Sequence, residues 1–180
     1  RDAIIEYFRS LEEDQLPLNE FKLLLVGDGG VGKTSLVKMM LGESFDEDEK
    51  QTKGINITDI DETKVRNWNL TKDNENIEVH IWDFGGQELM HATHQFFLSR
   101  RSLYILVVDS RKDEKIEYWL KHIESFGGDS PVLVVINKID ENPSFDVNRS
   151  FLANKYKGIK GFYRVSCSQN KGIDEFMDGL

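Results

Sequence analysis

The sequence has little of several features that mark whole classes of protein. It holds one cysteine among 180 residues, so an internal disulfide is excluded and we expect a reducing, cytoplasmic environment. No apolar run reaches the roughly 18 residues that a membrane-spanning helix needs. Insertion into a membrane is therefore not predicted.

Positive charge is also scarce. Lysine and arginine number 23 against 32 aspartates and glutamates, which gives a formal net charge of −9. This excess of negative charge argues against general binding to nucleic acid or to an anionic membrane surface. An acidic protein can still bind phosphates, but it must do so locally, with backbone amides, a lysine and a metal ion.

Composition is otherwise that of a globular protein, with 39% hydrophobic and 31% charged residues, and the length suits one domain with a full core. Short apolar runs alternate with helical patterns. Strands are expected at Leu23–Val26, Leu103–Val108, Val132–Ile136 and Phe162–Val165, and helices at Lys33–Leu41, Ile116–Phe126 and Val147–Tyr156. This alternation predicts an α/β fold with a six-stranded, mostly parallel sheet and helices on both faces.

The region after the first predicted helix is harder to assign. Ser44–Lys53 is acidic and lacks periodicity, so it is expected to be a loop. A strand is predicted at Ile77–Ile81, where apolar and polar residues alternate. For the strand before it, "INITDI" (55–60) and "VRNWNL" (65–70) both qualify.

Both ends of the chain indicate a piece of something longer. Apolar residues from Ile4 to Leu11 fall on one helical face, so residues 1–20 are expected to form a linker helix ahead of a domain at 21–180. A helical pattern from Gly172 is about two turns long, shorter than a typical helix. We interpret it as a truncated C-terminal helix.

A glycine-rich stretch, "GDGGVGKTS", lies between the first predicted strand and the first helix. It fits the pattern G-x-x-x-x-G-K-[ST] in the required context, so a phosphate-binding loop is favoured over a simple strand–helix turn. Glycines let backbone amides point inward, and the helix N-terminus adds partial positive charge. Lys33 would reach the β- and γ-phosphates, and the Thr34 hydroxyl would bind Mg²⁺. The predicted nucleotide-binding residues of this loop are Gly27, Asp28, Gly29, Gly30, Val31, Gly32, Lys33, Thr34 and Ser35.

A second motif, "DFGGQE" (83–88), ends the alternating strand. Strand-end residues project into the ligand crevice of an open α/β sheet. Asp83 is suited to hold Mg²⁺, Gly86 to offer its amide to a γ-phosphate oxygen, and Gln87 to orient an attacking water. Gln87 and Lys33 are the predicted catalytic residues. Alone, this stretch could equally be a strand-terminal aspartate before a turn, and the preceding phosphate loop favours the catalytic interpretation.

Two further strand ends, "NKID" (137–140) and "SCS" (166–168), indicate the base. The Asp140 carboxylate can accept from N1–H and the exocyclic amine of guanine, whereas adenine has no donor at N1 and would leave it unpaired. The Cys167 amide could bond the guanine carbonyl. Taken singly, each motif could be an ordinary turn. The predicted base-binding residues are Asn137, Lys138, Asp140, Ser166 and Cys167.

The order of these motifs resembles that of Ras-type small GTPases, and the residues around them resemble the Roc domain of Roco proteins. The stretches that carry the likeness are "IWDFGGQE", "MHATHQFFLSRRSLYILVVDSR", "YWLKHIESFGGDSPVLVVINKIDENPS" and "VSCSQNKGI". The resemblance implies a Ras-like phosphate-loop fold, GDP or GTP as ligand, Mg²⁺ as cofactor and slow GTP hydrolysis. It also makes Thr52, in "QTKGI", the first-switch threonine and a third Mg²⁺ residue beside Thr34 and Asp83.

The likeness covers about Phe21 to the end of the chain and departs from Ras at one motif. "SCS" replaces serine–alanine–lysine, so Ser168 cannot supply the lysine's contact to the base. No arginine can be assigned as an internal charge-neutralising group, since Arg100 and Arg101 only follow the second switch. The resemblance further implies leucine-rich repeats upstream, a COR dimerisation domain downstream and hence a homodimer.

Two alternatives stay open at this point. A nucleotide-gated interaction module with negligible hydrolysis would signal by binding alone, although a glutamine at Gln87 argues against it. An ATP-dependent phosphate-loop enzyme would use the same loop, although the carboxylate at Asp140 argues for guanine.

Overall fold

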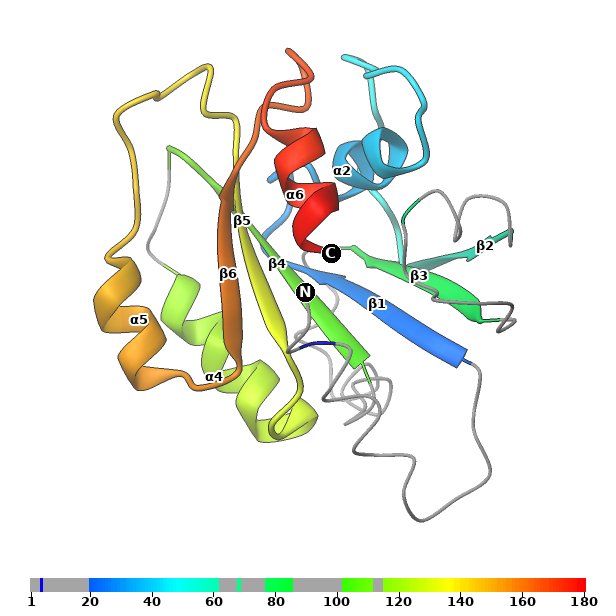
Figure 1. The fold of residues 1–180 in the computed structure, drawn as a ribbon. Helices are drawn as coiled ribbons and strands as arrows, with labels where there is room; N and C mark the ends of the chain where they lie inside the picture. Colours follow the sequence, from blue (N-terminus) through cyan, green and yellow to red (C-terminus); the bar gives the residue numbers. More distant parts are fainter. Residues whose placement is uncertain (1–3, 5–19, 62–67, 69–76, 86–101, 112–114) are drawn as a thin grey trace.

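The computed structural model describes residue 4, residues 20–61, residue 68 and residues 77–85, 102–111 and 115–180 (Figure 1). The elements in chain order are β1 (Glu20–Val26), α2 (Lys33–Met40), β2 (Ile55–Ile60), β3 (Glu78–Phe84), β4 (Ser102–Asp109), α4 (Ile116–Gly127), β5 (Val132–Asn137), α5 (Arg149–Lys155), β6 (Ile159–Arg164) and α6 (Ile173–Gly179). None of the helices among these residues is long and apolar enough to cross a membrane.

The described strands form a six-stranded sheet in the order β2-β3-β1-β4-β5-β6. Neighbouring strands are parallel except for β2 and β3, which are antiparallel. The predicted six-stranded, mostly parallel sheet is therefore confirmed. β1 lies where the sheet changes its direction of growth, with β2 and β3 on one side and β4 to β6 on the other. In open α/β sheets, ligands bind at the carboxyl ends of the strands near such a point.

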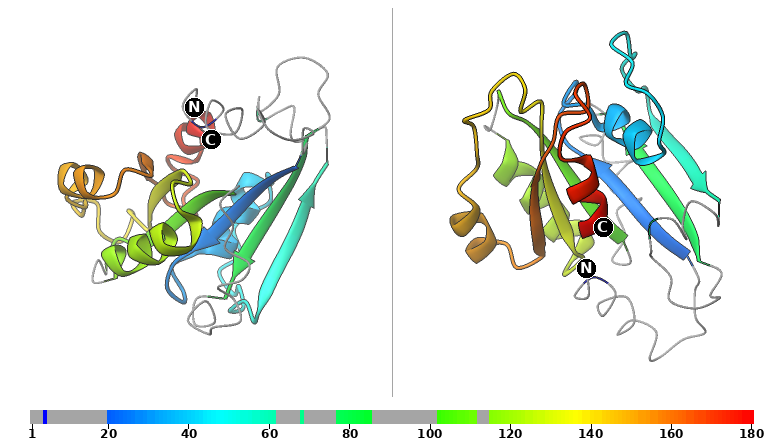
Figure 2. Two further views of the ribbon diagram at one scale, coloured as in Figure 1. Left: turned by 90° about the horizontal axis from the view of Figure 1, so that it is seen from below. Right: turned by 45° about the horizontal axis from the view of Figure 1, so that its top comes forward.

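The helices cover both faces of the sheet, as predicted. Leu23 and Leu25 of β1 belong to a hydrophobic cluster with residues of α2 and α6, whereas Leu24 and Val26 belong to a second cluster with residues of α4 and α5. Figures 1 and 2 show these two helix pairs on opposite faces. β4 and β5 are buried at every position, which explains their continuous apolar runs.

The choice between two candidates for the second strand falls on residues 55–60. These residues form β2, which pairs with β3 so that Ile57 lies opposite Trp82. Residues 65–70 lie outside the described residues, except for residue 68. The segment Ser44–Lys53 contains no helix or strand, in agreement with the predicted loop.

Helix α5 begins two residues later than predicted. It starts at Arg149 instead of Val147, because the Asn148 side chain accepts a hydrogen bond from the Phe151 amide at 3.1 Å. Asparagine is among the strongest N-caps. This start signal is visible in the sequence, but periodicity alone does not detect it.

Strand β6 begins earlier than predicted, and most of the predicted N-terminal helix lies outside the described residues. β6 begins at Ile159 instead of Phe162, since its pairing with β5 already starts opposite Val132. The predicted linker helix lies outside the described residues apart from Ile4. That side chain is buried and belongs to the cluster with α2 and α6.

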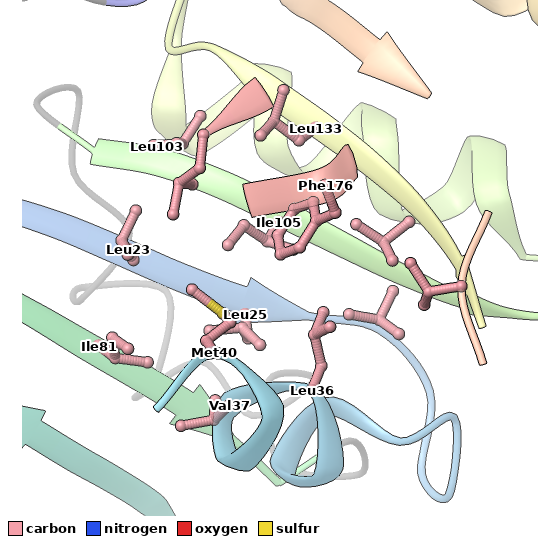
Figure 3. Close-up of a cluster of buried hydrophobic side chains, with 14 of the residues drawn as sticks. Leu23, Leu25, Leu36, Val37, Met40, Ile81, Leu103, Ile105, Leu133 and Phe176 are labelled. Atoms are coloured by element: carbon pink, nitrogen blue, oxygen red, sulfur yellow. The ribbon is translucent and has the colours of Figure 1, made fainter. Parts of the chain in front are cut away.

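Phe176 of α6 is a central side chain of that first cluster. Its ring is fully buried, meets Tyr163 edge-on with centroids 5.5 Å apart, and points toward β4 beside Ile105 (Figure 3). Helix α6 has only seven residues. Its position therefore depends on this packing more than on helix propensity.

Replacing Phe176 with alanine should lower the free energy of unfolding by about 3–5 kcal/mol, because buried contacts are lost and the surrounding core fills the cavity only in part. Urea unfolding of the two proteins measures the change. The matched control is Phe151→Ala on α5, where the residue is 45% exposed; this variant should lose about 1 kcal/mol or less. Equal losses at the two positions would contradict the packing.

Candidate functional site

The predicted functional motifs meet at one edge of the sheet. They follow the carboxyl ends of β1, β3, β5 and β6, which point the same way because these strands are parallel. A cavity of about 470 Å³ opens at this edge. Its walls combine the glycine-rich loop, the segment 45–52, the end of β3, and the strand ends at 137–138 and 167–168.

The loop after β1 has a backbone that only glycine can form at two positions. Gly27 has φ 142°, and a Cβ there would lie 2.2 Å from the Val107 carbonyl oxygen of β4. Gly32 has φ 93°, and a Cβ would lie 2.3 Å from Nδ2 of Asn137. The first and last glycines of the motif are therefore required by close approach of neighbouring strands and not by turn preference alone.

Lys33, the first residue of α2, turns back over the loop. Its ammonium donates hydrogen bonds to the carbonyl oxygens of Gly27 and Asp28, each at 2.9 Å. The residue is 5% exposed. Burial lowers the pKa of Lys33 to about 8, against the pull of the Asp83 and Asp28 carboxylates, which favour the charged form. A buried ammonium of this kind is charged at neutral pH and is held at the centre of the loop.

Thr34, Thr52 and Asp83 form a polar cluster beside Lys33. The Thr34 hydroxyl lies 2.5 Å from Oδ2 of Asp83 and 2.7 Å from the Thr52 hydroxyl, which lies 3.2 Å from the same carboxylate oxygen. Asp83 is 2% exposed, and its Oδ1 has no hydrogen-bond partner within the described residues. Burial raises the pKa of Asp83, although Thr34, Lys33 and Thr52 oppose this shift.

This donor set fits a small, hard cation. A buried carboxylate with one unused oxygen, next to two hydroxyl oxygens, offers the oxygen ligands that Mg²⁺ prefers. The three residues predicted as metal ligands are thus neighbours in the structure. Thr52 is the notable member, because only the family resemblance, and no local pattern, picked it out of an acidic loop.

Asn137 connects three segments of the site. Its Nδ2 donates to the Val31 carbonyl at 3.0 Å, while its Oδ1 accepts from the amides of Lys138 at 2.8 Å and Cys167 at 3.2 Å. The Cys167 amide, predicted to face the base, is therefore directed at Asn137 in this structure. Burial raises the pKa of the Cys167 thiol to about 12, which leaves it protonated and poorly nucleophilic.

Lys138 closes the site from the side of β5. It has φ 62°, and its ammonium donates to the Gly30 carbonyl at 2.8 Å and lies 3.2 Å from Oδ2 of Asp109. Asp109 ends β4 and is buried, but its hydrogen bonds with Arg111 and Lys138 outweigh burial and lower its pKa to about 2. Sequence reasoning missed Asp109 and Arg111; the signal was a polar "DSR" directly after a fully apolar strand.

Asp140 is held by hydroxyl groups from the last motif. Its Oδ2 accepts a hydrogen bond from Ser168 at 3.1 Å, and Oδ1 has no hydrogen-bond partner within the described residues. The hydroxyls of Ser166 and Ser168 keep the pKa of Asp140 below its usual value despite partial burial. The serine that replaces a lysine in this motif therefore orients the carboxylate.

The predicted Gly86 and Gln87 lie outside the described residues, as do Arg100 and Arg101. Ser35 and the loop glycines Gly29 and Gly30 line the cavity, and their contact with a nucleotide stays a prediction.

Lys33 should make stability depend on pH. Its pKa is about 8 in the folded chain, against an ordinary value of 10.5. Between these two values the unfolded chain holds a proton that the folded chain has lost, so stability rises with pH through this window, and the burial penalty is fully present below it. From pH 7 to pH 10, the protein should gain about 2 kcal/mol relative to Lys33→Met in nucleotide-free urea unfolding.

The matched control for this measurement is Lys121→Met, at an exposed lysine of α4. The Lys121→Met variant sets the baseline for this comparison, because the Lys121 side chain is exposed. A difference for Lys33→Met that does not change with pH would contradict the lowered pKa of Lys33.

Comparison with known proteins agrees with this geometry. The family described as "Ras of Complex, Roc, domain of DAPkinase" matches residues 22–140. A solved structure, Roco2 RocCORdC of Methanosarcina barkeri bound to GDP, is 62% identical with a TM-score of 0.79, over 95% of this chain and 50% of that chain.

Curated relatives include the probable serine/threonine-protein kinase pats1 of Dictyostelium discoideum, 32% identical over 99% of this chain and 6% of the kinase. A Roc-COR-CHAT protease from an unknown prokaryotic organism is 31% identical over 92% of this chain and 17% of the protease. The Ras-related protein Rab-7L1 of Rattus norvegicus is 30% identical over 87% of this chain and 78% of that protein. The chain spans only a small part of the first two relatives. The Roc match covers more than half of the chain and the fold is Ras-like, so the chain belongs to the Roc family of Ras-like GTPase domains.

Proposed function

We propose that this chain binds GDP and GTP together with Mg²⁺, hydrolyses GTP slowly, and acts as the nucleotide switch of a longer protein. The observation that carries the proposal is that Lys33, Thr34 and Thr52 line one cavity together with Ser168. Asp83 is hydrogen-bonded to the two threonines, and Asp140 is hydrogen-bonded to Ser168. The GDP in the Methanosarcina Roco2 structure, at 62% identity, supports the choice of nucleotide.

The phosphates would lie against the glycine-rich loop. Backbone amides and the N-terminus of α2 supply partial positive charge there, and Lys33 supplies a full charge from a buried position. A buried cation interacts strongly with an incoming phosphate because little water screens it. The overall charge of −9 is thus no obstacle to binding a polyanion at this place.

Thr34, Thr52 and Asp83 would hold the metal ion. Mg²⁺ supplies charge neutralisation for the β- and γ-phosphates when it is bound. Thr52 lies in the segment between α2 and β2, whereas Asp83 lies in β3. A metal-bound triphosphate that engages both Thr52 and Asp83 would order the segment 45–52 over the cavity. A switch requires such a contact, made in one nucleotide state and absent in the other.

Asp140 would read the base through N1–H and the exocyclic amine. The free Oδ1 and the lowered pKa of Asp140 suit a charged acceptor. Asn137 would act mainly by holding the surrounding segments together, since all of its described hydrogen bonds are to the backbone.

Hydrolysis would use water as nucleophile, oriented by Gln87, with Lys33 and the loop amides stabilising charge on the transferred phosphoryl group. A slow rate is expected because no arginine in the described part of the chain is free to neutralise charge on the transferred phosphoryl group. Each arginine in the described part of the chain is already engaged by another protein group; these are Arg111, Arg149 and Arg164. The alternative is an interaction module with negligible hydrolysis, which differs only in the role of Gln87.

The longer protein would be a cytoplasmic homodimer. The Roc-COR-CHAT relatives support a COR domain after the GTPase domain, and the COR domain would supply the dimer contact. Residues 1–20 would form the linker to leucine-rich repeats upstream.

Gln87→Leu should lower the single-turnover rate of GTP hydrolysis at least tenfold while leaving the affinity for GTP within about twofold. The residue has no phosphate or base to hold, so its loss should appear in the rate alone. Phosphate release is followed with protein in excess over nucleotide. A mutant rate equal to that of the unaltered protein would favour the interaction module.

Asp140→Asn should shift the base preference from guanine towards xanthine. An asparagine amide offers a donor as well as an acceptor, and xanthine carries a carbonyl where guanine has its amine. The aspartate facing the xanthine carbonyl and the asparagine donor facing the guanine amine are both mismatched pairs, and each costs roughly 1–3 kcal/mol. The ratio of GDP to XDP affinity should therefore change by about a hundredfold or more. Competition against a fluorescent nucleotide analogue measures the ratio.

The control for the base is Asp129→Asn, at an exposed carboxylate in the connection between α4 and β5. It should leave the GDP preference unchanged. An undiminished GDP preference in Asp140→Asn would remove Asp140 from base recognition.

A further inference from the structure

Asp28 is the only charged residue of the phosphate loop before Lys33. Its side chain leaves the loop and meets the first turn of α4. Oδ1 accepts a hydrogen bond from the Trp119 indole Nε1 at 3.1 Å, and Oδ2 lies 3.5 Å from the Lys115 ammonium. Both carboxylate oxygens therefore have a partner at the start of α4, the indole N–H for Oδ1 and the ammonium for Oδ2.

The two partners differ in how firmly they are held. Trp119 is 3% exposed and packs in the cluster between the sheet and α4, so its N–H has a fixed position. The Lys115 side chain is 58% exposed, and an exposed ion pair of this kind contributes little. The indole is thus the effective anchor, because a hydrogen bond to a charged acceptor in a partly buried place is among the stronger ones.

The backbone of Asp28 has a separate task. Its carbonyl oxygen, with that of Gly27, accepts the hydrogen bonds of the Lys33 ammonium. One residue therefore connects Lys33 with Trp119. The link joins helices on opposite faces of the sheet, α2 and α4, through the loop at the end of β1 (Figure 1).

A loop rich in glycine gains most from such an anchor. Gly27, Gly30 and Gly32 all have positive φ, and glycine loses more backbone freedom than other residues when it is fixed. A loop that is already held in its binding shape loses less entropy when a ligand arrives.

We propose that Asp28 is a positioning residue for the nucleotide: its bond to the Trp119 indole holds the phosphate loop in its binding shape and couples that shape to the first turn of α4. This inference rests on the proposed binding of GDP. Loss of the bond should appear as faster nucleotide release, with the rate of association little changed.

The test is the dissociation rate of a fluorescent GDP analogue from the 180-residue chain. Trp119→Phe keeps an aromatic ring in the core but removes the N–H, and should speed release about tenfold. Trp82→Phe, at an indole of β3, is the matched control and should change the rate by less than twofold. Lys115→Gln should have as small an effect as Lys121→Gln, at an exposed lysine of the same helix.

Variants of Asp28 distinguish a positioning role of the Asp28–Trp119 bond from a packing role of Trp119. Asp28→Asn keeps an oxygen that can accept from the indole and should release the analogue more slowly than Asp28→Leu. The double variant Asp28→Leu with Trp119→Phe should be no faster than the faster single variant, because both remove one bond. A merely structural role for Trp119 would give multiplied effects and no rescue by asparagine.

Two results would overturn the inference alone: dissociation rates for Trp119→Phe within twofold of the unaltered chain, or a double variant whose effects multiply. If Trp119→Phe does not fold, the Asp28 pair decides, and equal rates for Asp28→Leu and the unaltered chain overturn the inference. Failure of the unaltered chain and of Trp82→Phe to bind the analogue would instead overturn the proposed function, and the inference with it.

Discussion

Asn137 ties the candidate site together through both ends of one buried side-chain amide. It bonds the phosphate loop at Val31, its own strand end, and the last motif at Cys167. Because the amide lies 2.3 Å from where a Cβ of Gly32 would be, it also explains why that loop position must be glycine. The motifs are spaced along the chain as they are because each follows a parallel strand, and these strands end at one edge of the sheet. The Asn137 amide then joins the segments that meet at this edge.

Charge is arranged locally, against the sign of the whole molecule. Among the described residues, no carboxylate forms an ion pair with the buried Lys33 ammonium. It bonds two backbone carbonyls, so its charge stays available to a ligand. Lys138 is different, because Asp109 lies 3.2 Å from it and is itself neutralised by Arg111. That pairing fixes the Lys138 stem over Gly30. The domain therefore separates Lys33, the cation proposed to act on phosphate, from Lys138, which shapes the pocket.

Local sequence patterns predicted those parts of the site in which the backbone geometry requires a particular residue type. The phosphate loop was recognisable because Gly27 and Gly32 meet neighbouring strands at distances no side chain allows. Contacts between residues far apart in sequence were not recognisable. Asp28 and Trp119 are 91 positions apart, and the sequence around neither residue predicts the hydrogen bond between them. The same holds for the fold: the parallel strands followed from apolar runs, whereas the start of α5 depended on a cap that periodicity does not register.

The glycine-rich loop and the segment 45–52 are anchored by helices on opposite faces of the sheet. Lys38 of α2 pairs with Glu49 and lies 3.6 Å from Asp46, which holds the acidic segment before Thr52 against that helix. On the other face, α4 holds Asp28. A ligand in the cavity would touch elements tied to both helices, and a coupling free energy is reciprocal. With the nucleotide bound as proposed, any change in the position of either helix would alter nucleotide affinity by the same factor by which the nucleotide favours that position.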